Sequence, residues 1–169
     1  LSSGSYFPKP VKAVSIPKKG GGLRVLGIPT VEDRIAQMVA KMYFEPVVER
    51  LFYEDSYGYR PNKSAIQAIE KTRVRCWKRA WVLEFDIKGL FDNIRHDYLI
   101  EMVKRYTQEK WIILYVERWL KAPFQREDGS TLSRKAGTPQ GGVISPVLAN
   151  LFLHYPFDDF MEKEFPNIR

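Results

Sequence analysis

The sequence has very few of the residues that form disulfides or structural zinc sites. Among its 169 residues there are one cysteine, Cys76, and two histidines, His96 and His154. A single thiol cannot form an internal disulfide, and one thiol with two distant imidazoles is not a ligand set for structural zinc. The composition therefore excludes a disulfide scaffold and a structural zinc module, and it fits a reducing cytoplasm.

Long hydrophobic runs and a signal-peptide pattern are missing as well. The longest apolar runs, such as residues 111–116, are far too short to cross a bilayer. The N-terminus lacks a charged segment followed by an apolar one. We therefore expect a cytoplasmic protein without a membrane partner. The chain starts without methionine and stops on PNIR, so we expect both ends to be cut rather than natural.

Positive charge is what the sequence has in excess. Lys and Arg number 27 against 20 Asp and Glu, which gives a net charge of +7 and a pI of about 9.5. With 44% hydrophobic and 14% aromatic residues the chain has a globular composition. A basic globular chain favours a polyanionic partner, nucleic acid first and a membrane surface second. A merely soluble basic surface stays open as an alternative.

The N-terminal half predicts a hairpin followed by helices. Residues 11–29 form two arms rich in β-branched residues around the glycines of KKGGG, which predicts a β-hairpin. From Thr30, which can cap a helix, the apolar residues recur at helical spacing. A further helix is expected over residues 63–79. The predicted apolar positions of these two helices are Ile35, Met38, Val39, Met42 and Tyr43 in the first and Ala65, Ile66, Ala68 and Ile69 in the second.

The C-terminal half mixes strand and helix signals. WVLEFDI, residues 81–87, predicts a short strand that ends in an acid, and DGS marks the turn of a second hairpin. Helices are expected over 96–106 and 109–122. A last helix should start at Ser145 as its cap and Pro146, and Pro156 should end or kink it. Because the strands and helices follow no regular βαβ rhythm, we expect an α+β fold.

Three places could carry chemistry. Asp86 closes an apolar strand, where its carboxylate would cost desolvation unless it binds something such as Mg²⁺, which takes oxygen ligands. The nearby Asp92 and Asp97 have capping or supporting hydrogen bonds as their commoner role. Lys18 and Arg24 flank a glycine tip that could close over phosphates, although basic hairpin tips are also common solvated surface.

The third place is GTPQGGVISP, residues 137–146. Its glycine amides, its glutamine Gln140 and the start of the following helix could meet a nucleotide. A plain tight turn explains the same ten residues equally well.

Taken in order, four segments resemble the fingers and palm of a reverse transcriptase, most closely a bacterial group II intron-encoded reverse transcriptase/maturase. They are IPKKGGGLRVLGIPTVEDRIAQ, SYGYRPNKSAIQAI, FDIKGLFDNIRHDYL and GTPQGGVISPVLANLFLHY. The resemblance covers about residues 15–155. It implies a right-hand polymerase fold of β-hairpins and packed helices, with fingers over 1–80 and an incomplete palm over 81–169. Residues 107–135 could return to the fingers.

The resemblance also implies residue roles. Asp86 matches an aspartate that binds both catalytic Mg²⁺ ions, and the carbonyl of Ile87 matches the adjoining backbone ligand. Phe91 matches an aromatic gate that excludes a 2′-hydroxyl and so selects deoxynucleotides. The remaining matches are Lys18 and Arg24 with cations on the triphosphate, Gln140 with a glutamine beside the incoming nucleotide, and Arg60 and Asn62 with a block near the template path.

One part of the family pattern does not occur in these residues. The family pairs its first aspartate with an aromatic-Ala-Asp-Asp strand turn, and the 169 residues contain no such motif. The two-metal site is therefore incomplete in this piece. We expect the isolated piece to lack polymerase activity and the intact protein to have it.

The resemblance finally implies a function and partners. An intact protein of this kind would copy its intron RNA into DNA during retrohoming and would assist intron splicing. Its partners would be the intron RNA template, a DNA primer or target and dNTP, in the bacterial cytoplasm, and a homodimer is compatible with the sequence. The alternatives are an RNA-binding maturase module without a polymerase role, a retron, diversity-generating or defence-type reverse transcriptase, and a non-enzymatic scaffold.

Overall fold

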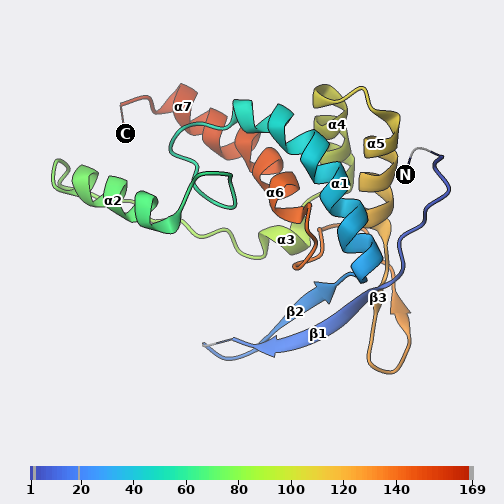
Figure 1. Cartoon of the computed structure of the whole chain (residues 1–169). Helices are drawn as coiled ribbons and strands as arrows, with labels where there is room; N and C mark the ends of the chain where they lie inside the picture. The colour runs from blue at the N-terminus through green and yellow to red at the C-terminus, as the bar shows by residue number, and fades with distance from the viewer. Residues whose placement is uncertain (2, 19, 168–169) are drawn as a thin grey trace.

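The computed structural model describes residues 1, 3–18 and 20–167, and it has a sheet at one end and helices above it (Figure 1). Lys19 of the expected hairpin tip and the last two residues of the expected palm lie outside the described residues. The elements are β1 (Val11–Pro17), β2 (Leu23–Ile28), α1 (Val31–Val48), η1 (Glu49–Leu51), α2 (Ala65–Cys76), α3 (Leu90–Asn93), α4 (His96–Tyr106), α5 (Lys110–Lys121), β3 (Phe124–Gln125), β4 (Thr131–Leu132), α6 (Ser145–Leu153), η2 (His154–Asp159) and α7 (Phe160–Glu164).

Both predicted hairpins form, and they join in one four-stranded sheet of order β2-β1-β3-β4. β1 and β2 are antiparallel, with Lys12 opposite Ile28. β3 runs parallel to β1, with Val11 opposite Phe124, and β4 closes the second hairpin. The pairing brings residues 124–132 to the N-terminal hairpin, while the division into fingers and palm stays a prediction. This sheet with its packed helices confirms the expected α+β class.

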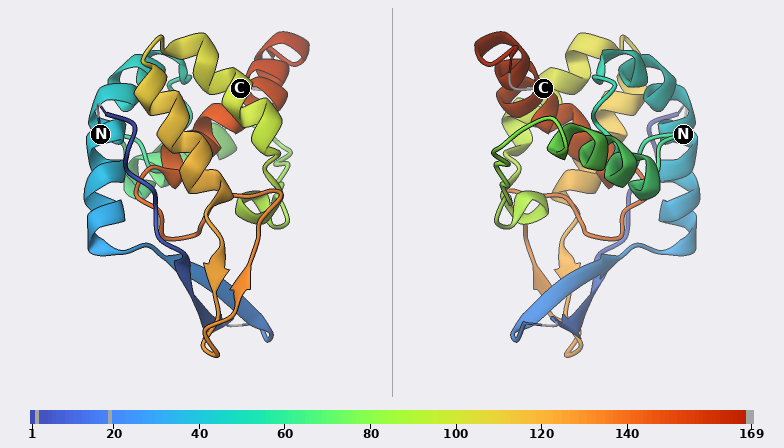
Figure 2. Two further views of the ribbon diagram at one scale, coloured as in Figure 1. Left: turned by 90° about the vertical axis from the view of Figure 1, so that its right-hand side faces the viewer. Right: turned by 90° about the vertical axis from the view of Figure 1, so that its left-hand side faces the viewer.

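The core lies where α1, α4, α5 and α6 meet above the sheet (Figure 2). α1 contributes Ala36, Ala40, Phe44 and Val48, whose spacing of four residues places them on one face of the helix. The largest fully buried side chains are Tyr115, Phe44, Ile94, Leu99, Ile112, Leu120, Ile144, Leu148 and Leu151.

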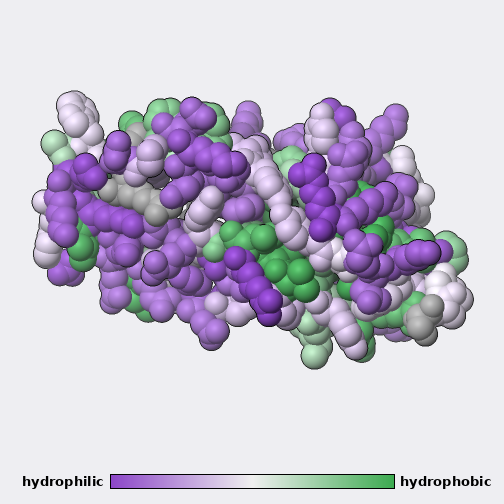
Figure 3. Space-filling view, turned by 90° about the horizontal axis from the view of Figure 1, so that it is seen from above, coloured by the Kyte–Doolittle hydropathy of each residue, from purple (hydrophilic) through white to green (hydrophobic). Residues whose placement is uncertain are grey.

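The predicted helix after Thr30 is confirmed, but the predicted apolar positions lie on its exposed side. Thr30 caps α1 by accepting a hydrogen bond from the backbone N–H of Asp33. Ile35 is 61% exposed and Met42 is 67% exposed. α1 carries apolar residues on two opposite faces, so helical spacing could predict the helix without predicting which face packs. Seen from above, the molecule is mostly hydrophilic with a hydrophobic patch near the middle (Figure 3).

The strand expected at residues 81–87 is not present. Within the described residues this segment pairs with no other strand, and Trp81, Leu83 and Phe85 are 88%, 70% and 67% exposed. An extended segment becomes a strand only when a neighbour takes up its N–H and C=O groups. The paired strands described here all belong to the sheet at the other end of the fold. Residues 81–85 instead border an apolar cavity of about 800 Å³ between α2 and α7.

The expected inward face of the helix over 63–79 needs correction, whereas the expected effect of Pro156 on the last helix is observed. Every residue of α2 is at least partly exposed, and the expected inward residues Ile66 and Ile69 are 68% and 66% exposed. The regular turns of α6 end at Leu153, but the chain continues through a π-helical stretch that contains Pro156 and then into α7. A wider turn accommodates a residue that has no N–H to donate. Among the helices of the described ranges, we find none with the length and hydropathy that a bilayer crossing requires.

The N-terminal segment is tied along α5 and to the start of α1 (Figure 2). Arg118 of α5 donates to the carbonyls of Gly4 and Tyr6. The Tyr6 hydroxyl donates to Asp33, which is 2% exposed and also accepts from Thr30 at 2.8 Å. Burial and the Asp33 carboxylate raise the pKa of Tyr6 well above its usual value. These bonds satisfy a buried carboxylate at the first turn of α1.

We predict that Tyr6→Phe lowers the free energy of unfolding by about 1–3 kcal/mol, because it removes a donor to a buried carboxylate. Urea unfolding of the purified chain measures the change. Tyr43→Phe is the matched control, since it removes a hydroxyl from a tyrosine that is 65% exposed. Equal stability of the two variants would show that the Tyr6 hydroxyl does not stabilise Asp33.

Candidate functional site

Residues 137–144, the 137–144 loop, connect β4 to α6 and are bonded through their backbone to separate parts of the chain. The N–H of Gly137 donates to the carbonyl of Ile94 at 2.7 Å, and the N–H of Thr138 donates to that of Phe91 at 2.7 Å. The carbonyl of Gln140 accepts from the N–H of Gly27 in β2 at 2.9 Å. The loop therefore links the N-terminal hairpin with α3 and its flanking residues.

Side chains fix the far end of this loop. The Gln37 Oε1 atom, from the buried face of α1, accepts from the N–H of Val143 at 2.7 Å and from that of Ile144 at 3.5 Å. The Thr138 hydroxyl donates to the hydroxyl of Ser145 at 2.7 Å in a buried position. Ser145, expected as the helix cap, is instead the first residue of α6, and Ile144 precedes it without a side-chain cap.

Three glycines of the loop lie too close to neighbouring atoms for any larger residue. A Cβ on Gly137 would lie 2.6 Å from the carbonyl oxygen of Phe91, and one on Gly141 would lie 2.6 Å from that of Gly27. Gly137 and Gly141 also have φ angles of 82° and 124°, which side chains rarely allow. A Cβ on Gly142 would lie 2.4 Å from the Ser145 hydroxyl. The loop is thus a tight structural turn.

The Gln140 side chain lies within this turn and remains available for a ligand. It is partly exposed, and among the described residues its amide group has no hydrogen-bond partner. Its backbone, in contrast, is held by Gly27. The tight-turn interpretation and the ligand interpretation are therefore compatible, because the backbone serves the first and the side chain can serve the second.

Phe91 lies beside the loop, at the second position of α3. The Phe91 carbonyl accepts a hydrogen bond from the N–H of Thr138, and Thr138 precedes Gln140 by two residues in the loop. The ring is partly buried and packs against the core. α3 itself starts after Gly89, whose φ of 64° is left-handed. The placement is compatible with a gate beside the nucleotide, which stays a prediction.

Asp86 and Ile87 lie on the unpaired segment that precedes α3. Both are exposed, and Asp86 forms no hydrogen bond or ion pair within the described residues. A carboxylate and a carbonyl are oxygen donors of the kind that Mg²⁺ takes, but one carboxylate is fewer than such a site usually needs. The described residues contain no group of three or more acidic, histidine or cysteine side chains that could hold a metal. They do not complete a Mg²⁺ site.

The two acids that follow Asp86 are placed on the surface of the fold. Asp97 pairs with Arg95, whose Nε lies 3.1 Å from the Asp97 Oδ1 atom, and this bond lowers the pKa of the Asp97 carboxyl. Asp92 is exposed in the first turn of α3. Asp97 therefore has the local supporting role that was expected to be the commoner one.

Lys18 and Arg24 lie at the tip of the first hairpin, and both are exposed. The register places Arg24 opposite Ile16, and Lys18 is two residues beyond Ile16. Because side chains alternate along a strand, both cations fall on the same face of the hairpin. Within the described residues no hydrogen bond or ion pair joins either cation to Asp86. The link between hairpin and loop runs through the backbone of Gly27.

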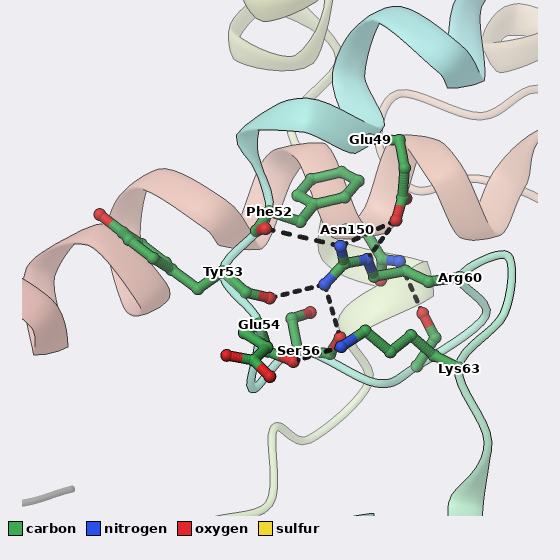
Figure 4. Close-up of polar contacts among 9 residues, drawn as sticks. Glu49, Phe52, Tyr53, Glu54, Ser56, Arg60, Lys63 and Asn150 are labelled. Atoms are coloured by element: carbon green, nitrogen blue, oxygen red, sulfur yellow. Dashed lines mark hydrogen bonds and ion pairs between the residues drawn. The ribbon is translucent and has the colours of Figure 1, made fainter. Parts of the chain in front are cut away.

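Arg60 is committed to internal contacts (Figure 4). Its side chain is 7% exposed and forms an ion pair with Glu49 at 2.8 Å. The guanidinium also donates to the carbonyls of Tyr53 at 2.6 Å and Ser56 at 2.7 Å, and it lies over the Phe52 ring. These contacts hold residues 52–60 against η1. A template contact through this guanidinium stays an untested prediction, and the geometry gives Arg60 a structural role.

Asn62 lies just after Arg60 in the loop that follows η1, and two further side-chain hydrogen bonds hold this loop. Asn62 is exposed and has a φ of 59°, a conformation that Asn tolerates better than most residues. Lys63 Nζ donates to the carbonyl of Glu54 at 2.8 Å, and Asn150 Nδ2 donates to that of Gly58 at 2.7 Å (Figure 4). The left-handed backbone conformation at position 62 accounts for an asparagine there. A role of Asn62 toward the template stays a prediction.

Sequence reasoning missed Gln37 and Gly27. Each contacts the 137–144 loop from more than 100 residues away in sequence. The available signal was a polar residue, Gln37, among the alanines and Phe44 of the buried face of α1. For Gly27 the signal was a glycine inside a strand, which often marks a close backbone approach. Neither signal names the partner.

We predict that Arg60→Ala destabilises the chain by about 3 kcal/mol, because it breaks a partly buried ion pair and leaves carbonyl groups without a donor. Thermal unfolding followed by circular dichroism measures the loss. Arg50→Ala, at an exposed neighbouring position, should change stability by less than about 0.5 kcal/mol. If Arg60→Ala left the melting temperature unchanged and only weakened RNA binding, the structural role would be wrong.

Comparison with known proteins shows relatives over nearly the whole chain. The chain is 36% identical to protein YkfC of Escherichia coli over 170 residues, which cover 98% of this chain and 44% of that protein. It is also 36% identical to the group II intron-encoded protein LtrA of Lactococcus lactis, over 91% of this chain and 26% of that protein. The chain therefore spans less than half the length of these relatives.

A solved structure and a family description agree with these relatives. The fold is similar to a chain of a partial Cas6-RT-Cas1–Cas2 complex, with a TM-score of 0.56 and 26% sequence identity over 95% of this chain and 27% of that chain. Residues 16–168 match the family described as reverse transcriptase (RNA-dependent DNA polymerase). Since this match covers most of the sequence, the chain belongs to the reverse transcriptase family.

Proposed function

We propose that the chain forms the fingers and part of the palm of an RNA-directed DNA polymerase encoded by a group II intron. Such a protein would copy intron RNA into DNA and assist splicing. The structural observation that supports the proposal is the 137–144 loop, whose backbone bonds Phe91 and Gly27 of the hairpin and whose Gln140 amide has no partner among the described residues. Relatives that are 36% identical include a group II intron-encoded protein, which favours that branch. A bacterial cytoplasmic location and a homodimer stay predictions.

The proposed chemistry is nucleotide addition, a phosphoryl transfer in which side chains position the reactants and neutralise charge. Lys18 and Arg24, exposed on one face of the hairpin, would hold the triphosphate. The Gln140 amide would bond the nucleotide, and the Phe91 ring would lie under the sugar and exclude a 2′-hydroxyl. Each of these roles needs only groups that the structure leaves accessible or partly accessible.

Bound Mg²⁺ would supply the neutralisation of charge on the transferred phosphate. Asp86 and the carbonyl of Ile87 are the donors that this chain offers, and further carboxylates must come from elsewhere. The unpaired segment 81–87 suggests where these further carboxylates would lie. We expect a strand with the aromatic-Ala-Asp-Asp pattern to add along this segment, where Trp81, Leu83 and Phe85 are exposed beside the cavity.

A primer-extension assay tests Asp86 in a polypeptide that continues past residue 169 through such a strand. We predict that Asp86→Ala lowers DNA synthesis about a hundredfold or more, because it removes a metal ligand. RNA affinity should stay within about twofold, since no phosphate contact is lost. The control Glu101→Ala removes an exposed acid of α4 and should leave both unchanged.

The 169-residue chain alone is a second arm of that assay, and it should give no extension product. Robust Mg²⁺-dependent synthesis by this chain would contradict the proposal that further carboxylates are needed to complete the metal site. Equal losses of RNA binding and of synthesis in Asp86→Ala would contradict the role of Asp86.

We predict that Gln140→Ala raises the KM for dNTP about tenfold, the equivalent of one lost hydrogen bond, with little change in melting temperature. The reason is that the Gln140 backbone holds the turn, while its amide bonds no other described residue. Steady-state primer extension and thermal unfolding of the same samples separate the two effects. A lower melting temperature with an unchanged KM would leave only the tight-turn interpretation.

A further inference from the structure

Gln37 is a buried polar residue whose only described hydrogen bonds reach the 137–144 loop. It lies on the packed face of α1 and is 3% exposed, in a series with Ala36, Ala40 and Phe44. Its Oε1 atom accepts from the N–H of Val143 at 2.7 Å. Burying an amide among apolar residues costs free energy unless its groups are bonded. An apolar residue would pack at this position without that cost, so the amide needs a reason beyond packing.

Beyond its bonds to Ile94 and Phe91, the loop is attached at Gln140 itself and again at Val143 and Ile144. At one end the N–H of Gly27 donates to the Gln140 carbonyl at 2.9 Å. At the other end Gln37 accepts from Val143 and, at 3.5 Å, from Ile144. Between them the N–H of Gly142 donates to the carbonyl of Pro139 at 3.1 Å, which closes the turn. These two attachments fix the backbone on both sides of Gly141 and Gly142, while the Gln140 amide bonds no described residue.

We propose that Gln37 is a positioning residue for nucleotide binding: its side-chain oxygen fixes the turn 139–144 so that the Gln140 amide faces the incoming nucleotide. The proposal rests on the proposed polymerase function. Gln37 acts through Gln140 and touches neither substrate nor metal. Its required property is an acceptor oxygen at the Oε1 position. Glutamate keeps that oxygen in either protonation state, and leucine has a similar size without it.

The first test measures the attachment itself and needs no polymerase activity. Amide hydrogen exchange is followed in the 169-residue chain for wild type, Gln37→Leu and Gln37→Glu. We expect exchange over residues 140–144 to speed up about tenfold or more in Gln37→Leu and to stay near wild type in Gln37→Glu. Unchanged exchange in Gln37→Leu would overturn the proposal, because the turn would then be held without Gln37.

The second test measures function in a polypeptide that extends DNA primers. Gln37→Leu should raise the KM for dNTP about tenfold with kcat within about twofold, and Gln37→Glu should restore most of the affinity. Val103→Ala is the matched control, since it destabilises the core in α4 without a bond to the loop. It should lower the melting temperature and leave KM unchanged. An equal rise of KM in Val103→Ala would show that the KM change in Gln37→Leu comes from lower stability alone, which would overturn the proposal.

A double variant decides whether Gln37 acts through Gln140. If it does, Gln37→Leu combined with Gln140→Ala should have the KM of Gln140→Ala alone. Independent, multiplying effects would overturn the proposal. If the wild-type polypeptide extended no primer, the proposed function would fail while the exchange experiment would still decide whether Gln37 holds the turn.

Discussion

The backbone of the 137–144 loop approaches β2 and the residues around α3 at hydrogen-bonding distance, and the relative placement of hairpin, helices and candidate site depends on that approach. Where Gly141 passes β2, a Cβ would lie 2.6 Å from the Gly27 carbonyl oxygen. A Cβ on Gly27 would in turn lie 2.6 Å from the Phe124 ring, so neither position has room for a side chain. The glycines therefore allow a backbone contact that joins segments more than 100 residues apart. The same contact uses the Gln140 carbonyl, and the Gln140 amide forms no hydrogen bond to another described residue.

Buried polar side chains complete the same framework on its other sides. Gln37 holds the start of α6, Arg60 holds the loop after η1, and Asp33 holds the N-terminal segment at the first turn of α1. Each has hydrogen-bond partners that offset the cost of its burial. A loop fixed in this way needs little regular secondary structure of its own. Conversely, each contact depends on one side chain, so the fold is sensitive to single substitutions at these positions.

The segment 81–87, unlike the 137–144 loop, is not held by hydrogen bonds to a neighbouring strand within the described residues. Its apolar side chains face a cavity. Asp86, the expected metal ligand, lies on this segment. Gln140 and Phe91, the proposed nucleotide contacts, therefore lie on backbone that is bonded within the chain, whereas Asp86 lies on a segment without such bonds in the described part of the chain.

Several elements could be predicted from the sequence because their signals are local. A glycine tip between β-branched arms predicted the first hairpin, and DGS predicted the second. Helical spacing predicted α4 and α5 nearly to the residue and the start of α1, although α1 continues through Pro46, where a helix break was expected. The order of four segments predicted the family, which the match over residues 16–168 confirms. For GTPQGGVISP the sequence left a tight turn and a nucleotide contact open; the structure shows the tight turn, and the contact through Gln140 stays a prediction.

The remaining features were decided by tertiary structure. The spacing in α1 could not choose between two apolar faces, because either satisfies a helical period until a neighbour packs on one. The strand signal of 81–87 could not produce a strand without a partner. The resemblance matched Arg60 with a block near the template path, and the fold surrounds its guanidinium with Glu49 and three carbonyls. The sequence by itself determined which segments are helical, tightly turned or basic. Only the folded chain decided which faces are buried and which polar groups meet, because those depend on residues distant in sequence.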